Sequence, residues 1–163
     1  MTVQSLRTQK GFTLIELLVV IGILAILLAI TLIAINPARQ FGQANDTNRR
    51  SAVTQILNAI GQYAASNSGQ LPGDVSALVA GAAPKVLDSV NFPNLCAQLV
   101  PTYLPALPAD PSANNQAGID ATACAGVWTT AGTSSAYAIA RDANNRITVS
   151  ATAPYAGPIQ VTR

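Results

Sequence analysis

The strongest pattern in the chain is a long apolar segment near its start. From Phe12 to Ile35, only Thr13, Glu16, Gly22 and Thr31 interrupt the run of apolar side chains. A helix rises about 1.5 Å per residue, so this stretch would cover roughly 36 Å, against a hydrocarbon core of about 30 Å. The segment therefore predicts a helix that can span a bilayer.

A second helical pattern begins after Asn36 and Pro37 and has a polar face. Apolar residues recur at helical spacing on one side of it, at Val53, Ile56, Leu57, Ile60 and Ala64. Polar residues fall largely on the other side, at Arg49, Arg50, Gln55, Asn58 and Gln62. Gly69 and Pro72 place the end of this helix near Ser68. We expect one long helix, apolar all round over 12–36 and amphipathic over 37–68.

The rest of the chain, 69–163, has the composition of a small β-rich domain. Prolines and glycines are frequent up to Gly126, with one short helix expected over Asn94–Val100. Short runs typical of strands follow at Gly126–Thr130, Ser135–Arg141 and Arg146–Thr152, with a turn before the last. We expect an antiparallel sheet packed on the Val53–Ala64 face, because an isolated hairpin is marginal in water. The predicted fold is α+β, with the long helix packed on this sheet-containing head.

The charge and the absence of histidine disfavour nucleic-acid binding and catalysis. The chain has nine Lys and Arg against seven Asp and Glu, and Arg7 and Lys10 precede the apolar segment, so the remainder balances at seven against seven. A neutral body is a poor electrostatic partner for nucleic acid. Without histidine there is neither the usual general base nor the usual zinc ligand. We expect no enzyme, no cofactor and no metal centre.

The two cysteines, Cys96 and Cys124, are 28 positions apart and lack C-x-x-C spacing. A redox pair or zinc knuckle is therefore not expected. In an exported protein they would more naturally form one disulfide, which contributes roughly 3 to 4 kcal/mol in the chain-entropy model.

The residues Lys10-Gly11-Phe12-Thr13-Leu14-Ile15-Glu16 open the apolar segment with a specific motif. This motif resembles the processing site of type IV prepilins and of the pseudopilins of type II secretion and DNA-uptake systems. The resemblance implies that a prepilin peptidase removes the leader 1–11 by cutting after Gly11 and methylates the new amine of Phe12. The disulfide-bearing head would then be that of a pilin.

Glu16 is the residue in this segment that most needs an explanation. An acidic group in a membrane-spanning helix costs about 3 kcal/mol to insert. Two charges about 4 Å apart attract by roughly 4 kcal/mol at an effective dielectric of 20, so a neighbouring subunit's Phe12 amine would offset that cost. Glu16 would then be unsatisfied in an isolated subunit and paired in an assembled one, and Thr13 could add a hydroxyl contact. The alternative is a glutamate that is merely solvated at the membrane interface.

Pro37 marks a break in the long helix. It cannot donate a hydrogen bond to the carbonyl of Ile33, and it biases Asn36 away from helical angles. Two expectations follow: a simple kink, or, as the resemblance implies, an unwound stretch from Gly22 to Pro37 in a filament.

Several weaker signals carry alternatives. The loop from Asp110 to Asp120, with Asn114 and Asn115, is interpreted as solvated rather than as a calcium site, since its spacing fits no EF-hand. Asn45-Asp46-Thr47 matches the N-glycosylation pattern, which arises often by chance. Trp128 is expected in the core beside the disulfide.

The functional prediction is a structural subunit of a type IV pilus, with a pseudopilin as the alternative and a plain membrane-anchored domain as a third hypothesis. A cleavable secretory signal is disfavoured because the apolar run is too long and no A-x-A site follows it. The resemblance implies a single-pass inner-membrane precursor that becomes a surface filament. Implied partners are other copies of the chain, the prepilin peptidase, a platform membrane protein and an assembly ATPase.

Overall fold

The computed structural model describes residues 11–113, 117–132 and 136–163. The leader residues 1–10, with Asn114, Asn115 and Ser135, lie outside this part. The described chain forms two compact units, one ending at Ala38 and the other running from Arg39 to Arg163. Each unit is described by itself below.

The first unit is built on helix α1, Leu14–Ala34. Its Leu, Ile, Val and Ala side chains point in all directions, and none of its residues is buried. The helix ends because Ile35 adopts an extended conformation (φ −94°, ψ 114°), and its N–H makes the last helical bond, to the carbonyl of Thr31 at 3.0 Å. α1 is long and apolar enough to cross a membrane.

Helix α2, Pro37–Ser66, follows after two residues. The single long helix expected from the sequence is thus interrupted at residues 35 and 36. Proline restricts the residue before it to extended angles and is favoured as the first residue of a helix, where no N–H bond is needed. α2 ends close to the expected Ser68, where Ser68 and Gly69 both have positive φ (55° and 84°).

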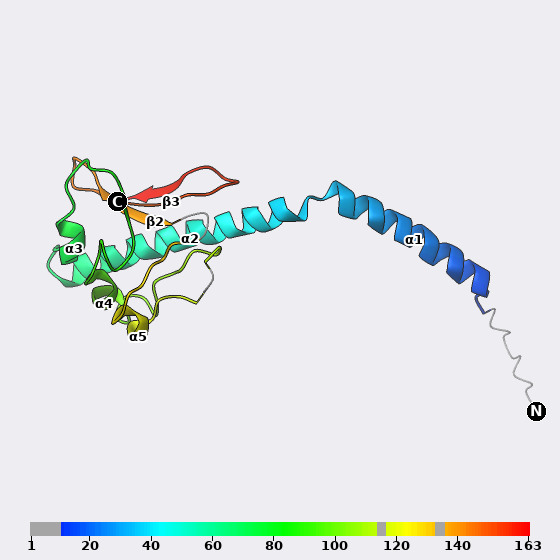
Figure 1. Ribbon diagram of the computed structural model, residues 1–163, viewed down its shortest axis with the longest axis horizontal. Coiled ribbons are helices and arrows are strands. Elements are labelled where there is room, and N and C mark those ends of the chain that lie inside the picture. Colours follow the sequence, from blue (N-terminus) through cyan, green and yellow to red (C-terminus); the bar gives the residue numbers. More distant parts are fainter. Residues whose placement is uncertain (1–10, 114–116, 133–135) are drawn as a thin grey trace, which may run out of the picture. The chain divides into compact units, whose positions relative to one another are not determined.

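The second unit gathers its short elements around the C-terminal part of α2 (Figure 1). These elements are α3 (Gly73–Ser76), β1 (Lys85–Val86), α4 (Leu95–Leu99), α5 (Ala121–Cys124), β2 (Tyr137–Arg141), β3 (Ile147–Ala151) and β4 (Ile159–Thr162). The strands form one antiparallel sheet in the order β1-β2-β3-β4. The α+β fold, with a long apolar N-terminal helix and a small antiparallel sheet, is the predicted one.

The predicted strands agree with the sheet in part. The β2–β3 hairpin and its turn at Asp142–Asn145 are confirmed, as is α4 within Asn94–Val100. The expected strand at Gly126–Thr130 is wrong, because this segment forms only an isolated bridge between Thr129 and Asp88. β1 and β4 were not expected, although Ile159–Thr162 has the alternation of a half-buried strand.

One hydrophobic core joins α2 to the sheet. Its fully buried members include Val53, Ile56 and Ile60 of α2 and Ile139 and Val149 of the sheet. The expected apolar face of α2 therefore does pack into the head, although Ala64 at its end is only half-buried.

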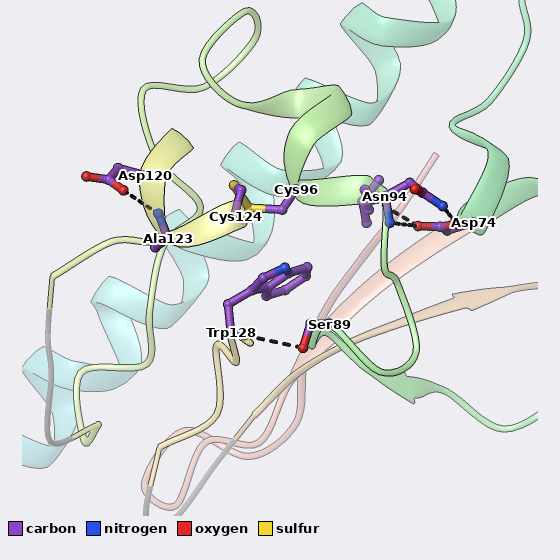
Figure 2. The surroundings of a disulfide bond; sticks show 9 residues. Asp74, Ser89, Asn94, Cys96, Asp120, Ala123, Cys124 and Trp128 are labelled. Carbon is purple, nitrogen blue, oxygen red and sulfur yellow. Dashed lines mark hydrogen bonds between the residues drawn. A yellow bond between two sulfur atoms is a disulfide. The ribbon is translucent and has the colours of Figure 1, made fainter. Parts of the chain in front are cut away.

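The disulfide between Cys96 and Cys124 joins α4 to α5 (Figure 2). Figure 2 shows the indole of Trp128 lying beside this bond, and Trp128 is buried as expected. The carbonyl of Trp128 accepts from the N–H of Ser89 at 3.0 Å. The disulfide thus closes the part of the core that contains the chain's single tryptophan.

Candidate functional site

The candidate assembly site lies at the start of α1. Phe12 is exposed, and Thr13 is the N-cap, with extended backbone angles (φ −79°, ψ 152°). The Thr13 hydroxyl accepts from the N–H of Glu16 at 3.3 Å, and Glu16 Oε2 accepts from the Thr13 N–H at 2.8 Å. This is a capping box, which satisfies two backbone donors at a helix start.

Glu16 also accepts a hydrogen bond from the Thr13 hydroxyl, with Oγ1 and Oε2 separated by 2.7 Å. The expectation that an isolated subunit leaves Glu16 unsatisfied is therefore wrong. Its carboxylate already has two donors from its own helix start. Pairing with a foreign amine would have to compete with this capping box or use the second carboxylate oxygen.

The α1 surface next to this site is apolar and uncovered. Every residue from Gly11 to Phe41 is exposed. Gly22 lies inside α1, where a Cβ would meet no neighbouring atom within 4 Å. The expected unwinding between Gly22 and Pro37 in a filament stays a prediction.

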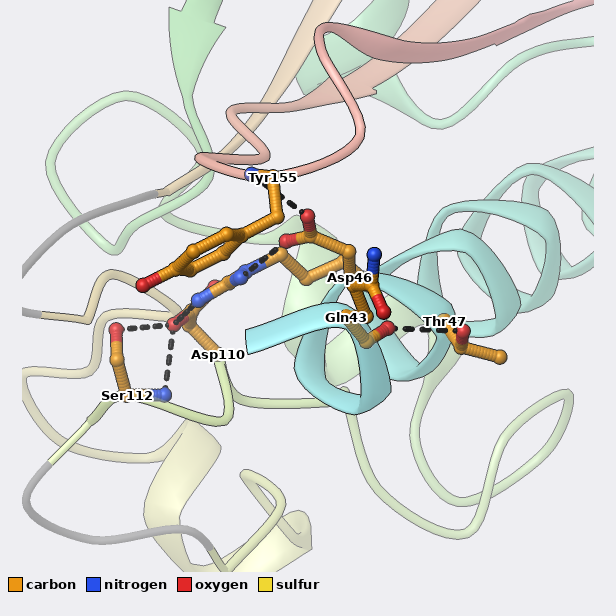
Figure 3. Close-up of polar contacts among 7 residues, drawn as sticks. Gln43, Asp46, Thr47, Asp110, Ser112 and Tyr155 are labelled. Carbon is orange, nitrogen blue, oxygen red and sulfur yellow. Dashed lines mark hydrogen bonds and ion pairs between the residues drawn. The ribbon is translucent and has the colours of Figure 1, made fainter. Parts of the chain in front are cut away.

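The head carries a second polar site, in which Arg49 of α2 contacts both Asp46 and Asp110. Figure 3 shows Asp46 and Asp110 in this site. Arg49 Nε donates to Asp110 Oδ2 at 2.7 Å and Nη2 donates to Oδ1 at 3.0 Å. Its Nη1 donates to Asp46 Oδ1 at 2.7 Å. All three side chains are buried, and a bidentate pair of this kind is the strong form of a charge-assisted hydrogen bond.

Two expectations about these residues were wrong. Arg49 was placed on the polar face of its helix, and Asp110 in a solvated loop, but both are buried. The hydrogen bonds from Arg49 to Asp110 raise the pKa of the Arg49 guanidinium above its ordinary value. Asp110 also accepts from the N–H and hydroxyl of Ser112, so its carboxylate is engaged with the protein's own donors.

The same cluster holds the segment between β3 and β4. Asp46 Oδ2 accepts from the N–H of Tyr155 at 2.9 Å. The Tyr155 ring lies against the bare backbone of Gly42, where an added Cβ would clash with the ring carbons. Only glycine permits this approach, so Gly42 is a positioning residue for Tyr155.

Three further aspartates, Asp74, Asp120 and Asp142, have separate structural partners. Asp74 accepts from the N–H groups of Asn94 and Leu95, at 2.6 and 2.9 Å. Asp120 caps α5 by accepting from the N–H of Ala123 at 2.8 Å. Asp142 accepts from the Arg146 N–H and side chain in the hairpin turn, and these bonds lower its pKa. Asp74 thus joins α3 to the start of α4, Asp120 caps a helix, and Asp142 stabilises the hairpin turn.

Sequence reasoning missed the Asp46–Arg49–Asp110 cluster. The only local signal was the spacing of Asp46 and Arg49, three residues apart on one helix face. Asp110 lies 61 residues further along the chain than Arg49, and no local sequence pattern predicts a partner at that distance.

Residues 6–32 match the family model for the prokaryotic N-terminal methylation motif. This motif is the signature of type IV pilins and prepilins. It covers the Gly11–Phe12 bond, Thr13 and Glu16, together with most of α1. No curated protein and no solved structure matches the chain.

The prepilin signature agrees with the structure of the described residues within it and after it. An exposed apolar helix of membrane-spanning length follows the processing motif, and a disulfide-bonded α+β head follows that helix. The methylation motif indicates the type IV pilin-like or pseudopilin family, and the apolar helix α1 is consistent with a membrane-anchored precursor. Proteins of this kind are structural rather than catalytic.

Proposed function

We propose that this chain is a structural subunit of a type IV pilus or pilus-like filament. A prepilin peptidase would cut after Gly11 and methylate Phe12, and the mature subunit would wait in the inner membrane before polymerising through α1. A platform membrane protein and an assembly ATPase would drive that step, leaving the head outside the cell. The chain itself would carry out no reaction.

The observation that carries this proposal is the exposure of the apolar side chains of α1. Its side chains are exposed all round the helix, so within the first unit nothing covers them. A lipid bilayer provides that cover in the precursor. Identical helices from other copies would provide it in a filament, where packing of apolar helices replaces contact with lipid.

Glu16 would favour the assembled subunit over the isolated one by exchanging its bonding partners. In the precursor its carboxylate is held by Thr13, and cleavage releases a charged amine at Phe12, four residues away. The amine of an incoming copy carries a full positive charge, so at about 4 Å and an effective dielectric of 20 it attracts the carboxylate by roughly 4 kcal/mol, a term that the uncharged donors of the capping box lack. Exchange of the intramolecular bonds for an intermolecular pair therefore favours the assembled state.

The test is intact mass spectrometry of wild type, Glu16→Gln and Glu16→Ala, recovered separately from sheared surface material and from membranes. Glu16→Gln keeps the shape of the side chain and removes its charge. We expect a chain that begins at methylated Phe12 in both wild-type fractions. Both variants should be cleaved but absent from the sheared fraction.

An uncut chain that begins at Met1 and stays in the membrane in all three cases would refute the proposal and leave a plain anchored domain. The alternative, a pseudopilin, gives the same mass and the same Glu16 dependence. It differs in that a short filament within the envelope yields little or no sheared material at native expression.

A further inference from the structure

The peptide bond between Gly11 and Phe12 lies just outside helix α1. The helix begins at Leu14, and Thr13 before it has the extended backbone angles of an N-cap. The hydrogen bond that opens the helix runs from the Leu17 N–H to the Thr13 carbonyl, at 3.3 Å. Among the residues that the structure describes, no backbone hydrogen bond reaches the Gly11 carbonyl or the Phe12 N–H. Both residues are exposed, so this bond is open to an enzyme.

The start of α1 is fixed by the capping box of Thr13 and Glu16. The Thr13 hydroxyl accepts from the Glu16 N–H, and Glu16 Oε2 accepts from the Thr13 N–H and hydroxyl. The first N–H groups of any helix lack partners within it, and a capping box supplies them. In an apolar environment an unbonded N–H group is strongly unfavourable. Without the box, the chain would bond these donors by extending the helix backward through Phe12 and Gly11.

Such an extension would remove the Gly11 carbonyl from the reach of a peptidase. In a longer helix this carbonyl would accept from the N–H of Ile15, four residues ahead. Its oxygen is the atom on which negative charge develops during hydrolysis, and it then has to accept hydrogen bonds from the enzyme instead. Glycine disfavours a helix at position 11 but does not forbid it, since helices tolerate single glycines. The cap is therefore needed to keep the bond outside the helix.

We infer that Thr13 is a positioning residue for the cut between Gly11 and Phe12, because as the N-cap of α1 it keeps that peptide bond extended and accessible. In the cut, water adds to the Gly11 carbonyl carbon and the C–N bond breaks, which leaves a carboxylate on Gly11 and an amine on Phe12. The inference rests on the proposed function and deepens it by naming what makes the bond cleavable. Glu16 then serves the capping box before the cut and the intermolecular pair after it.

The test ranks residues at position 13 by capping ability rather than by shape. Thr13→Val keeps the shape of threonine and removes the hydroxyl that caps the helix. Thr13→Ser and Thr13→Asn change the shape but keep a side chain that caps well. Thr31→Val is the matched control, since Thr31 lies inside α1 and its hydroxyl donates to the Leu28 carbonyl. Each full-length precursor is pulse-labelled in cells that contain the peptidase, and its conversion to the chain that begins at Phe12 is timed.

We expect Thr13→Val to slow conversion about fivefold, because an N-cap of ordinary strength, about 1 kcal/mol, corresponds to that factor. Thr13→Ser, Thr13→Asn and Thr31→Val should stay within about twofold of the wild-type rate. Fast conversion of Thr13→Val with slow conversion of Thr13→Asn would show that the peptidase reads the shape of threonine, and would overturn the inference. Equal rates for all the variants would overturn it as well.

A second measurement follows the backbone itself. Carbon-13 chemical shifts of the Cα atoms of Gly11 and Phe12 are recorded on the uncut full-length precursor in detergent micelles. We expect non-helical shifts in the wild type and in Thr13→Asn, and a change toward helical values in Thr13→Val. A slowly converted Thr13→Val that stays non-helical at both positions would refute the inference. A wild-type chain that the peptidase leaves uncut would instead be the failure of the proposed function.

Discussion

Tyr137 is buried in β2, and its hydroxyl has no hydrogen-bond partner among the residues the structure describes. Burial raises its pKa well above the ordinary value of 10, with a further contribution from the negative charge of Asp110. The folded state therefore holds the phenolic proton more tightly than the unfolded state does. The contribution of this group to stability is full below pH 10 and is lost as pH rises above it.

We predict that Tyr137→Phe removes part of the alkaline sensitivity of the head. In the wild type the free energy of unfolding should fall by up to about 1.4 kcal/mol per pH unit above pH 10 through this one group. At pH 8 the variant should be equal to wild type or more stable by about 1 kcal/mol, because it buries no unpaired hydroxyl. Denaturant unfolding followed by Trp128 fluorescence at pH 8 and pH 11 measures both effects. A stability difference between the two proteins that is the same at both pH values would show that Tyr137 does not titrate in this way.

At the scale of elements, one buried cluster ties three segments together. Asp46 and Arg49 come from α2, Asp110 from the loop before α5, and Tyr155 from the connection between β3 and β4. Removing one member of a buried ion pair leaves the other charge without its partner in a site with little water. The cluster is therefore expected to be sensitive to single substitutions.

We predict that Asp110→Asn lowers the free energy of unfolding by about 3 kcal/mol or more, because Arg49 loses the carboxylate that holds it by two bonds. Asp120→Asn is the matched control, since Asp120 is an exposed helix cap and asparagine caps helices as well as aspartate does. That variant should stay within about 0.5 kcal/mol of wild type. Denaturant unfolding of both variants at pH 7 measures the two free energies of unfolding. If both variants lost the same amount of free energy, the buried ion pair would contribute no more to stability than the exposed helix cap does.

The elements also show which parts of the fold local sequence could predict. The membrane-length helix and the apolar face of α2 follow from periodicity, which is a property of neighbouring residues. Arg49 was misplaced because its burial depends on Asp110, which is far away in sequence. Gly126–Thr130 had strand composition, but its neighbours across the chain pair with it at a single bridge only. β1 is two residues long, too short for any periodic signal.

The candidate assembly site could be predicted further than the buried cluster. Gly11, Phe12 and Glu16 were identified because a short motif and an acid within an apolar run are both local features. The capping box of Thr13 and Glu16 was also within reach, since it has the regular spacing of three residues. The role of Gly42 was not, because only the position of Tyr155, 113 positions further along, reveals it.

At the scale of the whole molecule, the two units differ in how much of their surface is buried. The unit that ends at Ala38 has no buried residue among those described, whereas residues 39–163 contain the hydrophobic core, the disulfide and the buried ion pairs. The buried residues that make up this core all come from residues 52–159, and none of them belongs to α1. In the proposed function, the apolar surface of α1 would be covered by the membrane or by other copies.

We predict that a fragment of residues 37–163, which keeps α2 whole and removes α1, folds as a monomer with the disulfide closed. Its free energy of unfolding should agree within about 0.5 kcal/mol with that of the full chain in detergent, because the hydrophobic core and the disulfide lie within residues 39–163 and a change outside them is expected to have a small effect. Analytical ultracentrifugation gives the mass, and Trp128 fluorescence gives the stability. A fragment whose Trp128 is already solvent-exposed without denaturant would show that the head depends on α1. Asp110→Asn in the same fragment should reproduce the loss seen in the full chain, because the cluster that it breaks lies wholly within residues 39–163.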